Sequence, residues 1–321
     1  MKNFISDILK GNNTIGIAGH VNPDGDSIGS SLGLYHYILD NYKDKKVTVH
    51  ATAVPKNLIT LPAAELIDIS SAKNTKYDLF IVVDVSDKER MGRNAKYVDL
   101  AKKTVIIDHH VTSVGNADYN YIKPEVSSTA EIICSLLEES KISSKTAECL
   151  YTGIVHDTGV FKYKAVTGET MKIAGMLVDK GVDTQKVIDD GFYSKTYVQN
   201  QILGKALLES MLFMDGRCIV SAVKQKDFDF YNVTPEDLAG IVEQLRLTVG
   251  VECAIFLYEK EPHVFKASLR SKEYVDVSKV AAYFGGGGHI RAAGCIVTGN
   301  MHDVITNIAK FIEQQMPLEN N

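Results

Sequence analysis

Unbroken apolar runs alternate with segments of helical spacing in the first half of the chain. Apolar side chains dominate residues 14–18, 47–53, 77–85 and 104–107. Such runs are typical of strands that are buried on both faces of a sheet. Residues 27–35 and 61–67 have the spacing of helices, and Asp26 or Ser27 is the expected N-cap of the first one. The alternation predicts an α/β fold in which helices cover both faces of a doubly wound parallel sheet.

The pattern changes after residue 127. Helical spacing runs through segments 128–137, 146–155 and 169–178, and then through a polar-faced segment at 193–212. A smaller α+β unit follows, with a hairpin turn at Asp215 and Gly216, strands at 253–258 and 264–269, and helices at 235–247, 277–283 and 302–314. We therefore expect two domains that are joined by a helical linker.

Histidine and aspartate side chains follow the ends of the predicted strands. His20 follows the first strand, Asp84 lies at the end of the 77–85 run, and Asp108 follows the next run. The carboxyl ends of parallel strands open on one crevice, where sheets of this kind bind ligands. Any one of these residues alone has an ordinary interpretation as a turn or helix-end residue. The whole set is His20, Asp24, Asp26, Asp84, Asp108, His109, His110 and Asp157.

This set is rich in oxygen ligands and contains no thiolate. Carboxylates suit Mg²⁺ or Mn²⁺, and added imidazoles move the preference toward Mn²⁺. Several carboxylates share one crevice only when cations neutralise them. We therefore expect two divalent ions about 3.5 to 4 Å apart, with Asp84 as the bridging ligand because it ends the central strand. Such a pair generates hydroxide and stabilises the charge of a phosphoester transition state.

Length and charge narrow the class of substrate. The chain has 321 residues, enough for two domains, and a net charge of -5, which argues against binding of long duplex nucleic acid. No segment reaches the roughly 18 continuous apolar residues that span a membrane. The five cysteines are scattered and form no C-x-x-C pair, so we interpret them as core residues in a reducing compartment. These features indicate a cytoplasmic protein whose substrates are short, and they leave a homodimer open.

The ordered motifs resemble those of the DHH phosphoesterases. The resemblance rests on His20 with Asp24-Gly25-Asp26, on Asp84, on the triplet Asp108-His109-His110, and on Asp157. The run Gly285-Gly286-Gly287-Gly288-His289, followed by Ala292-Ala293-Gly294, resembles the DHH-associated C-terminal domain of the RecJ-like branch. The resemblance covers nearly the whole chain. Two-domain members of this size are similar to the bacterial nanoRNases that also remove the 3′-phosphate from adenosine 3′,5′-bisphosphate.

The resemblance implies a role for each matching residue. One metal is expected on His20, Asp24 and Asp84, and the other on Asp26, Asp84, His109 and Asp157. Asp108 is expected to orient a ligand imidazole, and His110 to face the scissile phosphate as an acid or charge stabiliser.

The second domain is expected to hold the substrate. Glycine lets a backbone approach an anion closely, and a helix that starts near His289 would add its positive end. The candidate substrate-binding residues are Arg270, Ser271, Gly286, Gly287, Gly288 and His289, whereas the role of Arg291 stays open. The expected domains are a catalytic domain at 1–188, a helical linker at 189–211 and a substrate-binding domain at 212–321, with the active site in the cleft between the two domains.

The resemblance predicts a Mn²⁺-dependent enzyme that cleaves short oligonucleotides to mononucleotides, with adenosine 3′,5′-bisphosphate as a second substrate. Four alternatives stay open: a phosphodiesterase for cyclic or linear dinucleotides, a RecJ-like single-strand exonuclease, a manganese pyrophosphatase and a non-catalytic nucleotide sensor. The glycine run disfavours the pyrophosphatase, and the net charge and length disfavour the exonuclease.

Overall fold

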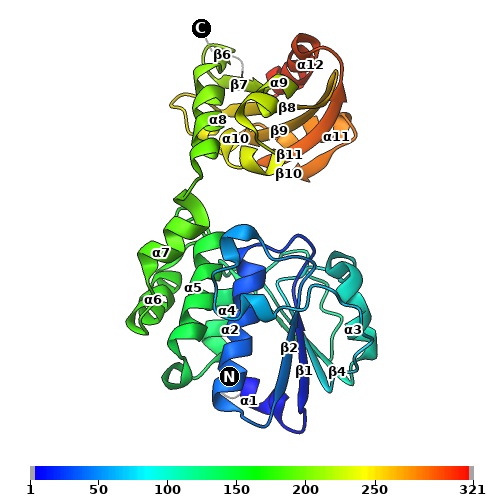
Figure 1. Cartoon of the computed structure of the whole chain (residues 1–321), viewed down its shortest axis with the longest axis vertical. Helices are drawn as coiled ribbons and strands as arrows, with labels where there is room; N and C mark the ends of the chain where they lie inside the picture. Colours follow the sequence, from blue (N-terminus) through cyan, green and yellow to red (C-terminus); the bar gives the residue numbers. More distant parts are fainter. Residues whose placement is uncertain (1–3, 318–321) are drawn as a thin grey trace. The chain divides into compact units, whose positions relative to one another are not determined.

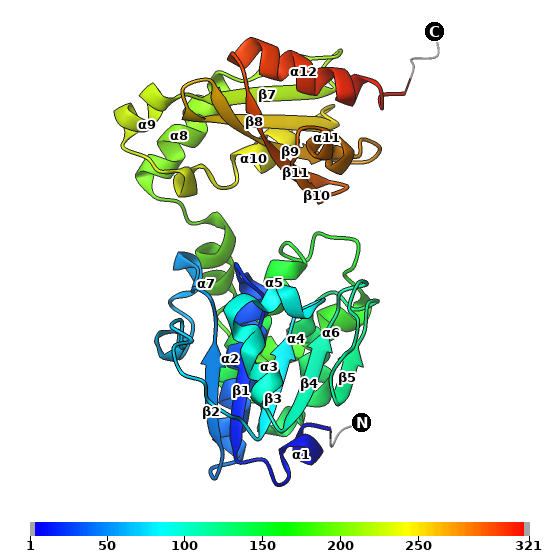
Figure 2. The ribbon, with the colours of Figure 1, turned by 90° about the vertical axis from the view of Figure 1, so that its right-hand side faces the viewer.

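The computed structural model describes residues 4–317, so the outermost ends of the two expected domains lie outside the described residues. The chain divides into two compact units, Met1–Ser194 and Lys195–Asn321. Figures 1 and 2 show the ribbon of each unit. No helix within residues 4–317 is both long and apolar enough to cross a membrane.

The first unit contains a parallel sheet of five strands in the order β2-β1-β3-β4-β5. Every residue of the central strand β3 is buried, as its unbroken apolar run predicts. In this strand order the crevice for ligands lies between the carboxyl ends of β1 and β3, where the connections leave in opposite directions. The strands are β1 (Thr14–Ala18), β2 (Lys46–His50), β3 (Leu79–Val83), β4 (Lys103–Asp108) and β5 (Tyr119–Ile122).

Helices cover both faces of this sheet, which confirms the predicted doubly wound architecture. Helices α2, α4 and α5 cover one face of the sheet, and α3 covers the other (Figure 1). Apolar side chains of α2, α4 and α5 form the core on the first face, and Tyr97 of α3 packs with Phe80 and Val82 on the second. The helices of this unit are α1 (Phe4–Leu9), α2 (Gly25–Asn41), α3 (Ala95–Leu100), α4 (Thr129–Leu136), α5 (Ser144–Asp157), α6 (Gly168–Asp179) and α7 (Thr184–Ile188). Shorter 3₁₀ turns are η1 (Lys56–Leu58), η2 (Ala64–Leu66), η3 (Lys88–Asn94) and η4 (Glu139–Lys141), and η5 (Asp189–Tyr193) is a π-helical turn.

Close packing of α2 on α5 brings distant parts of the sequence together. A methyl group on Gly29 of α2 would lie only 2.4 Å from the carbonyl oxygen of Cys149 in α5, so this contact requires glycine. The approach places the carboxyl end of α5, where Asp157 lies, close to the amino end of α2, where Asp24 and Asp26 lie. The residues of two separate motifs therefore meet.

The second unit is an α+β domain, as expected. Its sheet has the order β10-β11-β9-β8-β7-β6 and is antiparallel except for the β7 and β8 pair (Figure 2). One core lies between the sheet and α11 and α12, and a second core lies on the opposite face beneath α8 and α10. The strands are β6 (Met211–Phe213), β7 (Cys218–Val223), β8 (Cys253–Glu261), β9 (Val264–Ser271), β10 (Gly287–His289) and β11 (Ala292–Thr298). The helices are α8 (Tyr197–Leu208), α9 (Gln225–Tyr231), α10 (Ile241–Arg246), α11 (Val277–Tyr283) and α12 (Met301–Glu313), with the 3₁₀ turn η6 (Pro235–Leu238).

Three local predictions are wrong. The N-cap of α2 is Asp24, whose side chain accepts the N–H groups of Asp26 and Ser27. The helix expected at 235–247 is divided because Gly240 has a φ of 86°, a left-handed conformation that interrupts a helix. No helix starts near His289, since that residue ends β10 and the chain returns as β11.

Candidate functional site

The first ligand group lies at the switch point between β1 and β3. The Nε2 atom of His20 lies 3.6 Å from Asp24 Oδ1 and 3.3 Å from Asp84 Oδ2. One nitrogen or oxygen atom from each of the three side chains lies within 4.8 Å of the other two. His20 follows β1, Asp84 follows β3, and Asp24 is the N-cap of α2. These donors are the three that the sequence assigned to one metal.

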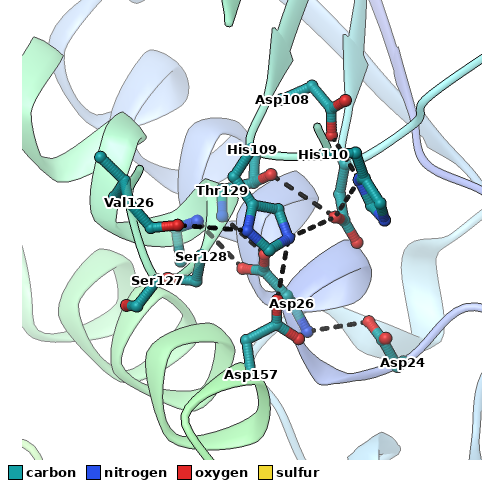
Figure 3. A network of polar contacts seen from close by, with 12 residues as sticks. Asp24, Asp26, Asp108, His109, His110, Val126, Ser127, Ser128, Thr129 and Asp157 are labelled. Atoms are coloured by element: carbon teal, nitrogen blue, oxygen red, sulfur yellow. Dashed lines mark hydrogen bonds and ion pairs between the residues drawn. The ribbon is translucent and has the colours of Figure 1, made fainter. Parts of the chain in front are cut away.

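The second group shares the same crevice. The Nε2 atom of His109 lies 3.0 Å from Asp157 Oδ2, and Asp26 completes a set whose donor atoms lie within 4.8 Å of one another (Figure 3). Asp84 Oδ1 lies 3.6 Å from the same His109 nitrogen. Asp84 therefore contacts a histidine of each group, which is the placement that a bridging ligand requires. That the six side chains hold metals stays a prediction.

Both histidines present the same ring atom to the carboxylates. The Nδ1 atom of His20 lies 2.7 Å from the Val21 carbonyl oxygen, and that of His109 lies 3.4 Å from the Val126 carbonyl oxygen. A metal-binding histidine usually donates its second N–H to such an acceptor, which fixes the tautomer. Both Nε2 atoms thereby face the carboxylates of the crevice.

His110 and Asp108 form a separate pair beside these groups. The Nδ1 atom of His110 lies 2.8 Å from Asp108 Oδ1, and Asp108 is fully buried. The sequence analysis expected Asp108 to orient a ligand imidazole, but the ring that it contacts belongs to His110. The same His110 nitrogen lies 3.7 Å from Asp84, so His110 is close enough to join the ligands or to act on a substrate bound there.

Burial and mutual charge shift the pKa values of the site strongly. Burial alone would lower the pKa of His20, but its contacts with Asp24 and Asp84 outweigh that effect and raise the pKa to about 10. Burial raises the pKa of Asp84 to about 6, although its contact with His20 opposes the shift. Burial and the charge of Asp157 raise the pKa of Asp26 well above its usual range. The carboxylates thus need positive charge, and the histidines supply it by holding protons.

His109 and His110 are shifted in the same direction. Burial opposes protonation of His109, but the contact with Asp157 and the charges of Asp26 and Asp84 raise its pKa to about 10. The contact with Asp108 raises the pKa of His110. Divalent cations would displace the protons of the ligand histidines and neutralise the same carboxylates. The donor set therefore fits two divalent ions chemically.

The sequence analysis missed Thr129 as a residue of the site. Its backbone N–H donates to Asp26 Oδ2 at 2.6 Å, the N–H of Ala130 donates to Asp26 Oδ1 at 2.9 Å, and the Thr129 hydroxyl lies 3.5 Å from Asp84 Oδ1. The start of α4 therefore positions two candidate ligands. Residues 128–137 predict only a helix, and the Ser128 side chain caps it by accepting the N–H of Glu131. Nothing in that segment signals the contact of α4 with Asp26 of α2.

The second unit places Arg270 and His289 on one face of its sheet. His289 of β10 is paired with Ala292 of β11, and Ala292 is paired with Arg270 of β9. Directly opposite residues of antiparallel strands point to the same face, so the two side chains are separated by two strand spacings, about 9 to 10 Å. Ala292 between them is small. Arg270 is also placed by Glu243 of α10, whose Oε2 lies 4.0 Å from its Nε.

Ser271 points to the opposite face. Its side chain is buried and donates to the Val275 carbonyl oxygen at 2.6 Å. The expectation that Ser271 binds substrate together with Arg270 conflicts with this arrangement, because successive side chains of a strand alternate between faces. Arg291, whose role was open, donates to the carbonyl oxygens of Val275 and Glu273 and so holds the same loop.

Gly286 lies in the bend that leads into β10, and Gly287 and Gly288 lie in that strand. A methyl group on Gly286 would lie 2.2 Å from the Gly294 carbonyl oxygen, so the bend packs directly against β11. Gly287 and Gly288 are exposed in the edge strand. An edge strand leaves backbone groups unpaired, and these can approach a ligand closely.

Comparison with known proteins identifies the family. A model of the DHH family N-terminal domain matches residues 14–154, and a model of the DHHA1 domain matches residues 215–317. A relative from Streptococcus mutans, a probable bifunctional oligoribonuclease and PAP phosphatase NrnA, is 32% identical over 89% of this chain and 90% of that protein. The chain belongs to the DHH family of phosphoesterases. Its members are metal-dependent hydrolases, and the clusters described above provide ligands for metals.

Other relatives of this DHH family member cover similar lengths. Bifunctional oligoribonuclease and PAP phosphatase NrnA from Thermus thermophilus is 29% identical over 92% of this chain and 88% of that protein. The protein of the same description from Bacillus subtilis is 26% identical over 88% of this chain and 89% of that protein. Among solved structures, an exopolyphosphatase-related protein from Bacteroides fragilis matches with a TM-score of 0.87 and 26% identity, covering 98% of this chain and 95% of that one.

Proposed function

We propose that the protein is a Mn²⁺-dependent phosphoesterase that cleaves short oligoribonucleotides to mononucleotides and dephosphorylates adenosine 3′,5′-bisphosphate to AMP. The observation that supports this most is the position of Asp84, buried between the histidines of two ligand groups at the end of the central strand. The names of the relatives support the choice of substrates. The five free, buried cysteines support a cytoplasmic location.

The expected ligands divide into two sets that share Asp84. His20 and Asp24 hold one ion, and Asp26, His109 and Asp157 hold the other. Two ions bound there supply a nucleophile at neutral pH and neutralise the charge of the phosphoester. The start of α4 keeps Asp26 in place through two backbone N–H groups, so this ligand needs no reorganisation when a cation binds.

His110 has the properties of the acid that assists departure of the leaving group. Its Nδ1 is engaged by Asp108, which leaves Nε2 as the atom that faces substrate. This contact raises the pKa of His110 and so favours the protonated ring that a general acid requires. Asp108 is fully buried and stabilises the protonated ring.

The second unit is proposed to hold the end of the substrate. Arg270 is suited to grip a phosphate with its planar guanidinium, and His289 lies on the same face with small Ala292 between them. Binding energy from such remote groups positions the scissile phosphate and raises kcat/KM. We propose that residues 189–211 link this unit to the catalytic one.

A substrate panel tests the proposal. Purified protein with Mn²⁺, and the same protein with EDTA, is assayed against a diribonucleotide, adenosine 3′,5′-bisphosphate, a cyclic dinucleotide and pyrophosphate. The proposal predicts that EDTA abolishes hydrolysis and that the first two substrates are preferred. Preferred hydrolysis of pyrophosphate, or nucleotide binding without any turnover, would overturn it.

A further inference from the structure

A left-handed turn follows Asp157 directly. Gly159, Val160 and Phe161 have φ values of 55°, 58° and 60°. A positive φ is uncommon outside glycine and is an outlier for a β-branched residue such as valine. Conformations of this kind persist only where the surroundings enforce them, and they cluster at functional sites. The conformation of this turn therefore indicates that it has a functional role.

Thr158 fixes the turn from inside. Its hydroxyl donates to the Ile154 carbonyl oxygen at 2.6 Å and accepts the N–H of Phe161 at 3.0 Å. Its carbonyl oxygen accepts the N–H groups of Lys162 at 2.8 Å and Tyr163 at 3.0 Å. The side chain of Phe161 packs against the core of the first unit. The backbone is thus held rigidly up to Tyr163.

The turn also positions the ring of Tyr163. A methyl group on Gly159 would lie 2.5 Å from Cζ and 2.7 Å from Cε2 of Tyr163, so the outer part of the ring lies on the glycine backbone. Tyr163 nevertheless stays 51% exposed. Gly159 is two residues from Asp157, a distance of at most about 7 Å between Cα atoms. An exposed aromatic ring therefore packs on backbone that is two residues from Asp157, whose carboxylate contacts His109.

Two lysines flank this ring. Lys162 and Lys164 are both exposed, and neither pairs with a carboxylate among residues 4–317. Their positive charge is opposite to that of the candidate ligand carboxylates. Rigid aromatic side chains with adjacent basic groups hold single-stranded nucleic acid, because every base has a face for stacking and every nucleotide has a phosphate.

We propose that the turn Gly159–Lys164 is a nucleotide subsite of the catalytic unit. Tyr163 stacks on the base of a nucleotide next to the scissile phosphate, and Lys162 and Lys164 contact the neighbouring phosphate of the same strand. This inference rests on the proposed function, because it needs an oligonucleotide substrate. In this proposal the first unit also binds part of the nucleotide substrate, a role that its metal ligands do not have.

The test compares Tyr163→Leu and Tyr163→Phe in the full chain with Mn²⁺. Leucine covers Gly159 but has no aromatic face, whereas phenylalanine keeps the ring. With a triribonucleotide, Tyr163→Leu should lower kcat/KM by about tenfold, chiefly through KM, and Tyr163→Phe should stay near wild type. Bis-p-nitrophenyl phosphate has no base, so both variants should hydrolyse it at the wild-type rate. With a trinucleotide that lacks the stacked base, wild type and Tyr163→Leu should have the same kcat/KM.

The lysines are tested through salt dependence. Lys162→Ala and Lys164→Ala should each reduce the slope of log(kcat/KM) against log[salt] by about 0.7, the value for one phosphate contact on a single strand. Lys145→Ala is the matched control, because Lys145 is an exposed lysine at the opposite end of α5 and should leave the slope unchanged.

These experiments distinguish an error in the proposed subsite from an error in the proposed function. If wild type cleaves bis-p-nitrophenyl phosphate but no oligonucleotide, the proposed function is wrong and the subsite has no ligand. If wild type cleaves the trinucleotide and Tyr163→Leu cleaves it equally well, only the subsite is wrong. Slower hydrolysis of the generic ester by Tyr163→Leu would show that the ring supports the fold instead, and this result also overturns the subsite.

Discussion

Replacement of Asp84 by Asn should separate metal binding from folding. Asp84 has a φ of 59°, and asparagine tolerates this left-handed conformation better than alanine does. The amide has nearly the same shape as the carboxylate but no charge. The variant should therefore fold like wild type while it loses the bridging ligand and nearly all phosphoesterase activity.

The pKa of Asp84 gives the magnitude. In the folded protein without metal it is raised from 3.8 to about 6. Above pH 6 the ionised carboxylate therefore destabilises the folded state, and a shift of this size corresponds to about 3 kcal/mol. Asp84→Asn removes that penalty, so the metal-free variant should be more stable than wild type by up to about 3 kcal/mol at pH 7.5. The advantage should shrink as the pH falls through about 6 and vanish below about 4.

Bound metal should offset most of this advantage. Mn²⁺ at 100 times its Kd stabilises a protein that binds it by about 2.7 kcal/mol. Wild type should gain this stability and the variant should not. Thermal unfolding in EDTA and in Mn²⁺, together with elemental analysis, measures both effects. If Asp84→Asn is less stable than wild type in EDTA, or gains as much from Mn²⁺, the reasoning is wrong.

Asp78 provides a control at the opposite end of the same strand. Its contacts with Lys102 and Thr14 lower its pKa, so its ionised form stabilises the folded state. Asp78→Asn should therefore lower stability with or without Mn²⁺ and leave metal content unchanged. The two substitutions have opposite signs because burial outweighs the histidine contacts at Asp84, whereas the contacts with Lys102 and Thr14 outweigh burial at Asp78.

Four further predictions concern His110, Arg270, the pair of His20 and His109, and Ser271. His110→Ala should lower kcat by about 10² to 10⁴ without changing metal content, whereas lost metal would make His110 a ligand. Arg270→Ala should lower kcat/KM by about 10² for dinucleotides and adenosine 3′,5′-bisphosphate. Its kcat/KM for bis-p-nitrophenyl phosphate should stay within a few-fold of wild type. An equal loss on both kinds of substrate would contradict the proposed role of Arg270. The metal-free protein should lose stability as the pH rises from about 6.5 toward 10. The reason is that His20 and His109 keep their protons in the folded protein, whereas an unfolded histidine releases its proton near pH 6.5. A Tm in EDTA that does not change over this pH range would contradict this prediction. Ser271→Ala should cost about 1 kcal/mol of stability through the lost bond to Val275 and leave kcat/KM for dinucleotides unchanged.

The architecture of the first unit could be predicted because its signal is local. Residues 79–83 are buried on both faces of the sheet, and only an unbroken apolar run fits such a strand. Because β3 and β4 are parallel, Asp84 and His109 lie at the same edge of the sheet, independently of how the connecting helices pack. Strand β5 was missed because its residues are exposed or half-buried and its sequence has no apolar run.

Errors arose where long-range packing decides the structure. The glycine run preceding His289 is compatible with a loop, a helix start or a strand, and the choice depends on pairing with β11. Ser271 follows Arg270 in sequence, yet alternation along β9 separates their side chains. The contact of Thr129 with Asp26 joins residues 103 positions apart, and a single sequence contains no signal for it.

The dependence of kcat/KM on substrate length tests the central claim most directly. Wild-type protein with Mn²⁺ is given end-labelled RNA of 2 to about 20 nucleotides, and initial rates are measured for each length. An enzyme that holds the end of a short strand should be most active at about two to five nucleotides and should lose activity on longer strands, which its binding groups cannot seat. Equal or rising activity on the longest strands would contradict the account and favour a processive exonuclease.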